Sequence, residues 1–325
     1  MELLKTLTQA FGTSGNENNI CEILKANAKK YCDEISVDAL GNLIAHKKGN
    51  GKKVMISAHM DEIGIIATFI DKDGFIRFSN VGGLYTKQLV GRRVKFENGT
   101  IGVIGSEEED FDKKAELSKL FIDIGEKSED STKKYVNIGD MASFEGDYYQ
   151  NSNVVISKAL DNRVGCYILL EVMKDAKTDN DLYFVFSSQE EVGLRGAKAA
   201  AYSINPDYAI AVDVTDTGDC PSSPSNCVKL GGGAAIKIMD RSVLCDSYVR
   251  GFMIDMAREN NIPYQLEIMT DGGTDAGAMH LSRGGVKTGG ISVPTRYIHS
   301  PSEMASVGDI KDCIRLLKTV IEKIQ

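Results

Sequence analysis

Short apolar runs separated by amphipathic segments fill most of this 325-residue chain. The run at residues 53–58 is followed by polar residues, which is typical of a buried strand, and comparable runs lie at residues 181–187 and 208–214. Elsewhere apolar side chains recur every three or four positions, which indicates helices. The expected helices are residues 162–174, 195–202, 246–260 and 309–324, and two further strands are expected at 234–239 and 285–293. This alternation predicts an α/β fold with a mixed sheet.

One long stretch departs from the alternation. After residue 65, strand-like segments are punctuated by Asp73-Gly74 and Asn98-Gly99, dipeptides that suit hairpin turns. The β-rich character continues through the charged segment 106–118. We therefore predict two domains. Residues 1–65 and 153–325 form the α/β domain, and residues 66–152 form an inserted small β-barrel or sandwich.

The N-terminal segment gives two further expectations. The first forty residues look helical, and Ser14 and Glu17 have the spacing of a capping box before an apolar rhythm. Residues 1–5 lack the basic region, apolar run and small-residue cleavage site of a secretory signal. We therefore expect a cytoplasmic location and reduced thiols.

Composition and charge exclude several classes of function. Lys and Arg total 38 and Asp and Glu total 46, so the formal net charge is −8, and no basic stripe is present. We expect no nucleic-acid partner. No segment approaches the ~20 apolar residues of a membrane span, so we expect no membrane partner. The seven cysteines show no Cys-x-x-Cys spacing, which argues against disulfides and a thiolate zinc site.

Three predicted strands end in side chains that commonly bind metal ions. His59 follows the first strand. Glu190 and Glu191 follow the second, and Asp213 lies near the end of the third. In open α/β sheets the ligand crevice lies beyond the carboxyl ends of the strands, so we expect these groups to converge.

Asp161, which opens a predicted helix, and His299, in a loop after a Gly-rich strand, complete the set. Two imidazoles and three carboxylates fit two Zn²⁺-like ions about 3.5–4 Å apart, with one carboxylate bridging them and Glu190 left over. Three carboxylates and a bridging hydroxide would balance two divalent ions. Asp61, two residues after His59, could accept a hydrogen bond from the imidazole N–H that does not face the metal and so fix its tautomer.

Each of these features also has an ordinary structural interpretation. A lone His after a strand is often only hydrogen-bonded, and adjacent Glu residues often face solvent. His46 is expected to be exposed on a strand, and His280 to pack or cap a helix. The Gly-rich stretches at 231–233 and 271–277 are either flexible turns or walls of a substrate cleft.

Five motifs decide between these interpretations. They are AHMDEIG at 58–64, LDNR at 160–163, QEEVGLRGA at 189–197, VDVT at 212–215 and HSPSE at 299–303. In this order they closely resemble the dinuclear aminopeptidases of metallopeptidase family forty-two, and the likeness covers essentially the whole chain. The resemblance implies a zinc-peptidase-like catalytic domain with an inserted barrel. Similar proteins assemble through that barrel into tetrahedral dodecamers, so we expect a homo-oligomer.

The resemblance also implies a role for each ligand. His59 and Asp213 would hold one ion, Glu191 and His299 would hold the other, and Asp161 would bridge them. The family has a cis peptide after the bridging Asp, which is Asp161-Asn162 here. We expect two divalent ions per subunit, with Zn²⁺ as the first candidate and Co²⁺ or Mn²⁺ as alternatives.

The expected activity is removal of the N-terminal residue from short peptides. Glu190, as general base, would take a proton from a water shared by the two ions, and the hydroxide would attack the scissile carbonyl. Asp61 would support His59. The enzymatic alternative is a metal-independent glycoside hydrolase, an endoglucanase, that uses two carboxylates such as Glu190 and Asp213.

A third interpretation is a binding scaffold with structural metals and saturated coordination. The preferred substrate side chain is left open by the sequence. Arg241 and Arg250 are the basic candidates for a pocket that would bind an acidic residue.

Overall fold

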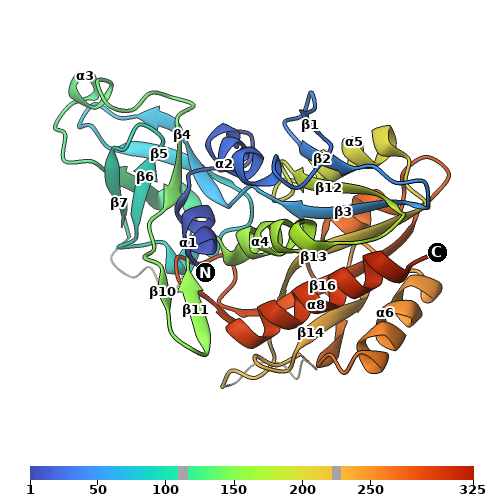
Figure 1. The fold of residues 1–325 in the computed structure, drawn as a ribbon. Coiled ribbons are helices and arrows are strands. Elements are labelled where there is room, and N and C mark those ends of the chain that lie inside the picture. Colours follow the sequence, from blue (N-terminus) through green and yellow to red (C-terminus); the bar gives the residue numbers. More distant parts are fainter. Residues whose placement is uncertain (109–115, 222–227) are drawn as a thin grey trace.

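The computed structural model describes residues 1–108, 116–221 and 228–325. A large mixed sheet flanked by helices lies beside a smaller closed barrel (Figure 1). The predicted α/β class with a β-barrel is therefore confirmed. Part of the charged segment 106–118 lies outside the described residues. Within the described part of the chain, no helix is both long and apolar enough to cross a membrane.

The large sheet has eleven strands in the order β1-β2-β12-β3-β13-β16-β17-β11-β10, with β14 paired to β16 and β15 paired to β14. Its strands are β1 (Glu34–Val37), β2 (Leu43–Lys47), β3 (Lys53–His59), β10 (Tyr149–Gln150), β11 (Val154–Ser157), β12 (Asp181–Ser187), β13 (Tyr208–Asp216), β14 (Ala234–Met239), β15 (Tyr264–Ile268), β16 (Lys287–Arg296) and β17 (Glu303–Ser306). The central strands β12, β3, β13 and β16 are parallel. Their carboxyl ends therefore lie at the same edge of the sheet.

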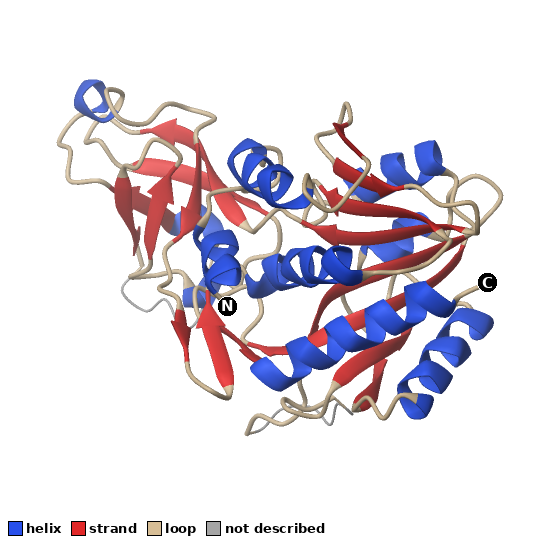
Figure 2. Cartoon of the chain, viewed as in Figure 1, coloured by secondary structure: helices blue, strands red, loops and turns tan. Residues whose placement is uncertain are grey.

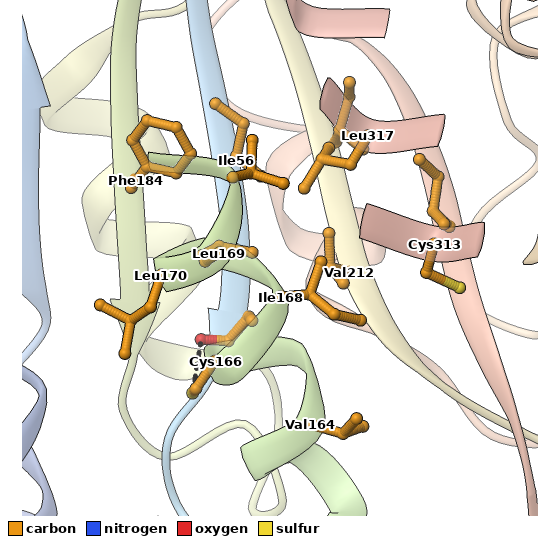
Figure 3. Close-up of a cluster of buried hydrophobic side chains, with 14 of the residues drawn as sticks. Ile56, Val164, Cys166, Ile168, Leu169, Leu170, Phe184, Val212, Cys313 and Leu317 are labelled. Carbon is orange, nitrogen blue, oxygen red and sulfur yellow. Dashed lines mark hydrogen bonds between the residues drawn. The ribbon is translucent and has the colours of Figure 1, made fainter. Parts of the chain in front are cut away.

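Side chains of the central strands alternate between two apolar cores. In β3, Val54 and Ile56 pack into the larger core, whereas Met55 packs into a separate core on the opposite face. In β13, Val212 belongs to the larger core and Ala211 to the other. The strict period of two follows from the pleat, because successive side chains point to opposite faces. Figure 3 shows the larger core between the strands and the helices.

Helices cover both faces of the large sheet (Figure 2). The larger core is completed by α1 (Glu2–Gln9), α2 (Asn18–Ala28), α4 (Leu160–Asp175), α6 (Ser247–Glu259) and α8 (Val307–Lys323). The opposite core is completed by α5 (Arg195–Ile204) and α7 (Asp275–Met279). The result is a three-layer arrangement in which the sheet is buried on both sides, as parallel strands require.

The barrel closes in the order β4-β5-β8-β7-β6-β9 around an apolar core of its own. Its strands are β4 (Gly64–Ile70), β5 (Ile76–Val81), β6 (Arg93–Phe96), β7 (Ile101–Ser106), β8 (Leu120–Asp123) and β9 (Met141–Phe144). Short helical segments are η1 (Thr86–Gln88), η2 (Leu117–Lys119) and α3 (Glu129–Thr132). The expected turns at Asp73-Gly74 and Asn98-Gly99 join β4 to β5 and β6 to β7. The domain limits at 66 and 152, and a role of the barrel in assembly, stay predictions.

The predicted central helices and strands are confirmed to within a few residues. The sequence did not predict β1, β2, β11, β15 or β17. The helical character expected for the first forty residues is wrong at Glu34–Val37, which form β1. In β1 and β15 most side chains are exposed or half-buried, so these strands carry no apolar run. Edge strands of this kind are specified by their partners rather than by their own pattern.

A fully buried arginine ties α1 and the segment after it to the loop that follows β3. Arg163, in the first turns of α4, is 0% exposed. It donates to the carbonyl oxygens of Leu7 at 2.5 Å, Ala10 at 3.0 Å and Met60 at 2.7 Å. It also contacts Glu62 at 3.4 Å. Every contact is made by a planar guanidinium with fixed donor directions, so no other side chain satisfies the same set.

We expect Arg163→Met to lower the free energy of unfolding by about 3–5 kcal/mol, because buried carbonyl oxygens lose their donor and Glu62 keeps only Lys158 as a cationic partner. Chemical denaturation monitored by circular dichroism measures the change. Lys174→Met is the matched control on the same helix, since Lys174 contacts only Glu171 at the surface and should cost about 1 kcal/mol or less. Equal losses in the two variants would contradict the proposed role of Arg163.

Candidate active site

The register of the central strands brings His59 and Asp213 to one level. His59 lies opposite Ser187 of β12, and Ser57 lies opposite Ala211 of β13. Asp213 is two residues beyond Ala211, as His59 is two beyond Ser57. Both side chains therefore emerge on the same face, at the carboxyl edge of the sheet.

Asp161 lies between the two histidines. One of its carboxylate oxygens is 3.0 Å from His59 Nε2, and the other is 3.5 Å from His299 Nε2. His59 Nε2 is also 3.7 Å from Asp213 Oδ1, and His299 Nε2 is 3.2 Å from Glu191 Oε2. Two groups of possible ligand atoms, each within 4.8 Å of one another, thus share the Asp161 carboxylate. All five predicted ligands converge as the sequence suggested.

The electrostatics of the cluster favour cations. Burial lowers the pKa of His299, but the charge of Glu191 and the contact with Asp161 raise it to about 12. Burial likewise lowers the pKa of His59, and the charge of Glu190 together with Asp161 and Asp213 raises it well above its usual value. The field that attracts a proton to both imidazoles also attracts divalent ions. The mixed imidazole and carboxylate donors therefore fit two ions of the Zn²⁺ type.

Glu190 stands beside this cluster. Its Oε2 lies 3.9 Å from His59 Nε2, and it belongs to neither group of ligand atoms. Burial raises the pKa of Glu190 well above its usual value; His59 opposes the shift, and the carboxylates of Asp213 and Glu191 add to it. A carboxylate with a raised pKa accepts a proton more readily, which suits a general base.

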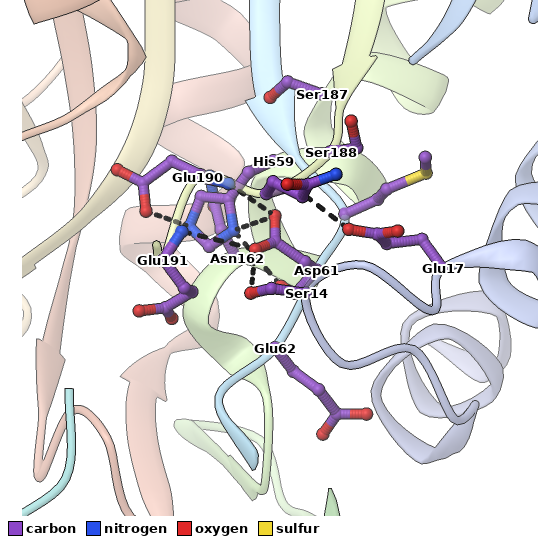
Figure 4. Close-up of polar contacts among 12 residues, drawn as sticks. Ser14, Glu17, His59, Asp61, Glu62, Asn162, Ser187, Ser188, Glu190 and Glu191 are labelled. Atoms are coloured by element: carbon purple, nitrogen blue, oxygen red, sulfur yellow. Dashed lines mark hydrogen bonds and ion pairs between the residues drawn. The ribbon is translucent and has the colours of Figure 1, made fainter. Parts of the chain in front are cut away.

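Asp61 anchors the loop that carries Glu190 and Glu191 (Figure 4). It accepts hydrogen bonds from the backbone N–H of Glu190 at 3.1 Å and of Glu191 at 3.2 Å, and from Ser14 Oγ at 2.6 Å. His59 Nδ1 is 3.1 Å from the backbone carbonyl of Asp61 and 3.5 Å from its carboxylate. Asp61 therefore contacts both the imidazole and the loop of the candidate base.

The capping box expected at Ser14 and Glu17 is wrong. The helix α2 begins at Asn18 without a side-chain cap. Glu17 instead accepts hydrogen bonds from the backbone N–H of Gly15 at 2.7 Å and of Gln189 at 3.1 Å. Gln189 has a φ of +53°, in the left-handed region that side chains disfavour. Glu17 therefore stabilises the turn before Glu190 and does not cap α2.

Glu303 ends the HSPSE motif and is a functional candidate to which the sequence assigned no role of its own. Its two oxygens accept hydrogen bonds from the backbone N–H of Asp161 and of His299, each at 2.9 Å. It is 2% exposed. The cis peptide expected at Asp161-Asn162 is present. One carboxylate therefore fixes the backbone at two predicted ligands, and an acidic residue four positions after His299 was the available signal.

Asp275 is a second group that sequence reasoning missed. It is buried at the start of α7 and accepts hydrogen bonds from Ser57 Oγ and Ser187 Oγ, each at 2.5 Å. Burial raises its pKa to about 6, and the two hydroxyls oppose the shift. Asp275 thus joins β3 and β12 directly beneath the strand ends that carry His59 and the candidate base.

A cavity of about 470 Å³ opens over the cluster. The residues that line it are His59, Gly83, Tyr85, Asp161, Glu190, Glu191, Gly193, Leu194, Asp213, Val214, Thr215, Asp216, Met269, Asp271, Gly272, Gly273, Thr274, Ile298 and His299. The Gly-rich stretch at 271–274 is therefore a cleft wall. The other Gly-rich stretch is a turn, because the N–H groups of Gly231 and Gly233 donate to Asp309.

The two remaining histidines lie outside the cavity. His280 ends α7, and its Nδ1 lies 3.0 Å from the carbonyl oxygen of Ala276, so the prediction of a helix cap is confirmed. His46 lies on β2 as expected, but its predicted exposure is wrong. Its side chain is 14% exposed, because it stacks on Tyr183 and its Nε2 lies 2.6 Å from Asp181.

Comparison with known proteins identifies close relatives. The sequence model described as M42 glutamyl aminopeptidase matches residues 41–316. A protein from Acetivibrio thermocellus that carries an aminopeptidase description is 55% identical, with 98% of each chain covered. The lysyl aminopeptidase of Pyrococcus furiosus is 33% identical over 100% of this chain and 97% of its own. The TET1 peptidase of Pyrococcus horikoshii, which assembles into a tetrahedron or an octahedral shell, has a TM-score of 0.90 and 34% identity, with 99% of each chain covered.

We expect Glu303→Gln to weaken zinc binding by about 10–100-fold, because a side-chain amide replaces one acceptor oxygen and opposes a backbone N–H. Titration of the apoprotein against a competing zinc chelator measures the affinity. Glu259→Gln makes the same change at the exposed end of α6 and is the control. Unchanged affinity in the Glu303 variant would show that this carboxylate does not position the ligands.

Proposed function

This chain belongs to the M42 glutamyl aminopeptidase family and is an aminopeptidase, and on that premise we propose that its cavity removes the N-terminal residue of short peptides with two divalent ions. The placement of Asp161 between His59 and His299 carries the proposal. In it, His59 and Asp213 would hold one ion, Glu191 and His299 would hold the other, and Asp161 would contribute to both. Zn²⁺ suits these donors, as do Co²⁺ and Mn²⁺.

Bound divalent ions would supply two kinds of chemistry at this site, a lowered pKa for water and polarisation of a carbonyl oxygen. The remaining steps fall to the chain. Glu190 accepts a proton from the attacking water and passes it to the departing amine. Asp61 and Glu17 keep that carboxylate in place through the backbone of its loop.

The charge of the cavity supports cleavage at a free N-terminus. A peptide α-amine is positive near neutral pH, and carboxylates surround the place where the chain would end. An internal peptide bond offers no such group. The cavity therefore suits an exopeptidase.

A metal-independent glycoside hydrolase is the weaker alternative. It would use Glu190 and Asp213 as its two carboxylates. His59 and His299 would then have no role in the reaction. The family match favours the peptidase. Enzymatic relatives also argue against a binding scaffold with only structural metals.

Assembly and location complete the proposal. The TET1 peptidase relative forms closed shells, and we propose that this chain also forms a homo-oligomer, a tetrahedral dodecamer, through the barrel. A cytoplasmic location stays a prediction from the sequence.

We expect Glu190→Gln to lower kcat by about 10²–10⁴-fold, because the amide cannot accept the proton of the attacking water. Metal content, measured by mass spectrometry of the purified protein, should stay at the wild-type level. Glu259→Gln again serves as the charge-matched control on α6. Peptidase activity retained by the Glu190 variant would contradict its role as base.

Chelation separates the two enzymatic alternatives. We expect EDTA to abolish hydrolysis of aminoacyl-p-nitroanilides, because the peptidase activity depends on the bound ions. Addition of Zn²⁺, Co²⁺ or Mn²⁺ should restore it. A soluble glucan should not be cleaved under either condition. Glucan hydrolysis that survives EDTA would instead establish the glycosidase.

A further inference from the structure

The barrel contributes a loop to the cavity. This loop lies between β5 and η1, and its residues Gly83 and Tyr85 line the cavity. A Cβ atom on Gly82 would lie 3.2 Å from the Cβ of Glu191, and one on Gly83 would lie 3.0 Å from Nδ1 of His299. The loop backbone therefore packs directly against two of the candidate ligands, in a space that leaves little room for a side chain.

The loop is anchored to the barrel. Leu84 packs against the apolar core of the barrel. Asn80 Nδ2 donates to the carbonyl oxygen of Gly82 at 2.7 Å, and the backbone N–H of Gln88 donates to that of Tyr85 at 2.8 Å. Tyr85 follows Leu84 directly, yet it is 56% exposed. The backbone position of Tyr85 is therefore fixed, while much of its side chain is accessible to a ligand.

The Tyr85 ring lies at the distance of a second substrate residue from the cluster. Its centroid is 6.5 Å from that of the His299 imidazole. Consecutive Cα atoms of a peptide are about 3.8 Å apart, so a peptide with its first carbonyl at the ions carries its second side chain roughly 4–8 Å farther out.

Tyr85 is also chemically distinct within the cavity. Among the described residues that line it, Tyr85 is the one aromatic side chain besides the two imidazoles. Arg241 and Arg250, the basic candidates suggested by the sequence, do not line the cavity. Aromatic rings attract one another when their centroids are about 4.5–7 Å apart. The exposed part of the Tyr85 ring offers such a contact to a substrate.

We propose that Tyr85 binds the side chain of the second peptide residue, the residue that leaves with the new amine, and that its ring favours an aromatic side chain there. The inference rests on the proposed function, since it places the scissile bond at the metal cluster. A Gly at the second position has no side chain to contact the ring. The barrel thereby takes part in substrate binding within its own subunit.

The experiment compares kcat/KM of the metal-loaded enzyme for leucyl-phenylalanyl-glycine and leucyl-glycyl-glycine, from the initial release of free leucine measured by chromatography. Because the first residue is the same, any preference for it cancels in the ratio. The wild type should prefer the phenylalanyl peptide by roughly two- to tenfold, as expected for one aromatic pair. Tyr85→Ala should abolish this preference, and Tyr85→Phe, which keeps the ring, should retain it.

Tyr135→Ala is the matched control. Tyr135 follows α3 in the same inserted segment, is 49% exposed and does not line the cavity, so its loss should leave the ratio unchanged. Zinc content, measured by mass spectrometry, should equal that of the wild type in every variant, because the ring contacts the substrate and not the ions.

Three results would overturn the assignment. The first is a wild type that cleaves the two peptides equally well, and the second is a Tyr85→Ala variant with the wild-type ratio. The third is loss of zinc from that variant, since the ring would then act through His299. A wild type that releases leucine from neither peptide would overturn the proposed function as well, so the two failures are distinguishable.

Discussion

Mutual repulsion among buried carboxylates is the constraint on which this structure depends. Asp161, Glu190, Glu191 and Asp213 gather with two imidazoles at one edge of a sheet that is buried on both faces. Charges of one sign at this spacing are costly without a counter-charge. The surrounding fold holds them together with rigid contacts, and divalent ions are the counter-charge that both the donor types and their geometry accommodate.

The rigid contacts come from distant parts of the chain. Glu303 fixes the backbone at Asp161 and His299, and Asp61 fixes the loop of Glu190. Arg163 ties α1 and the segment after it to the loop that follows β3 at this edge of the sheet. Each is a buried charged group with several hydrogen-bond partners, so each specifies one arrangement of segments that are far apart in sequence. These contacts fix the backbone of the candidate ligands and of the Glu190 loop from outside the cluster.

The sequence predicted the central α/β elements and the convergence of five candidate ligands because both leave local signals. Apolar runs mark the buried strands, and the polar residues at their ends mark the edge where parallel strands deliver ligands. The supporting contacts leave weaker signals: Asp61 and Glu303 lie in the quoted motifs, but their hydrogen bonds to the backbone of Glu190 and of Asp161 join segments far apart in sequence. Ser14 and Glu17 match a capping box locally, yet their partners are Asp61 and Gln189. The sequence suggests that the His46 side chain is exposed, but in the structure Asp181 and Tyr183 of β12 contact its imidazole. Long-range pairing decides such positions, and single-sequence patterns do not contain it.

The central claim is that one carboxylate, Asp161, joins two ions held by His59 and His299. Anomalous diffraction at the zinc edge, from crystals of the zinc-loaded protein, tests it most directly. We expect two peaks about 3.5–4 Å apart, one on each side of the Asp161 carboxylate. A single peak, or two peaks that do not share Asp161, would contradict it.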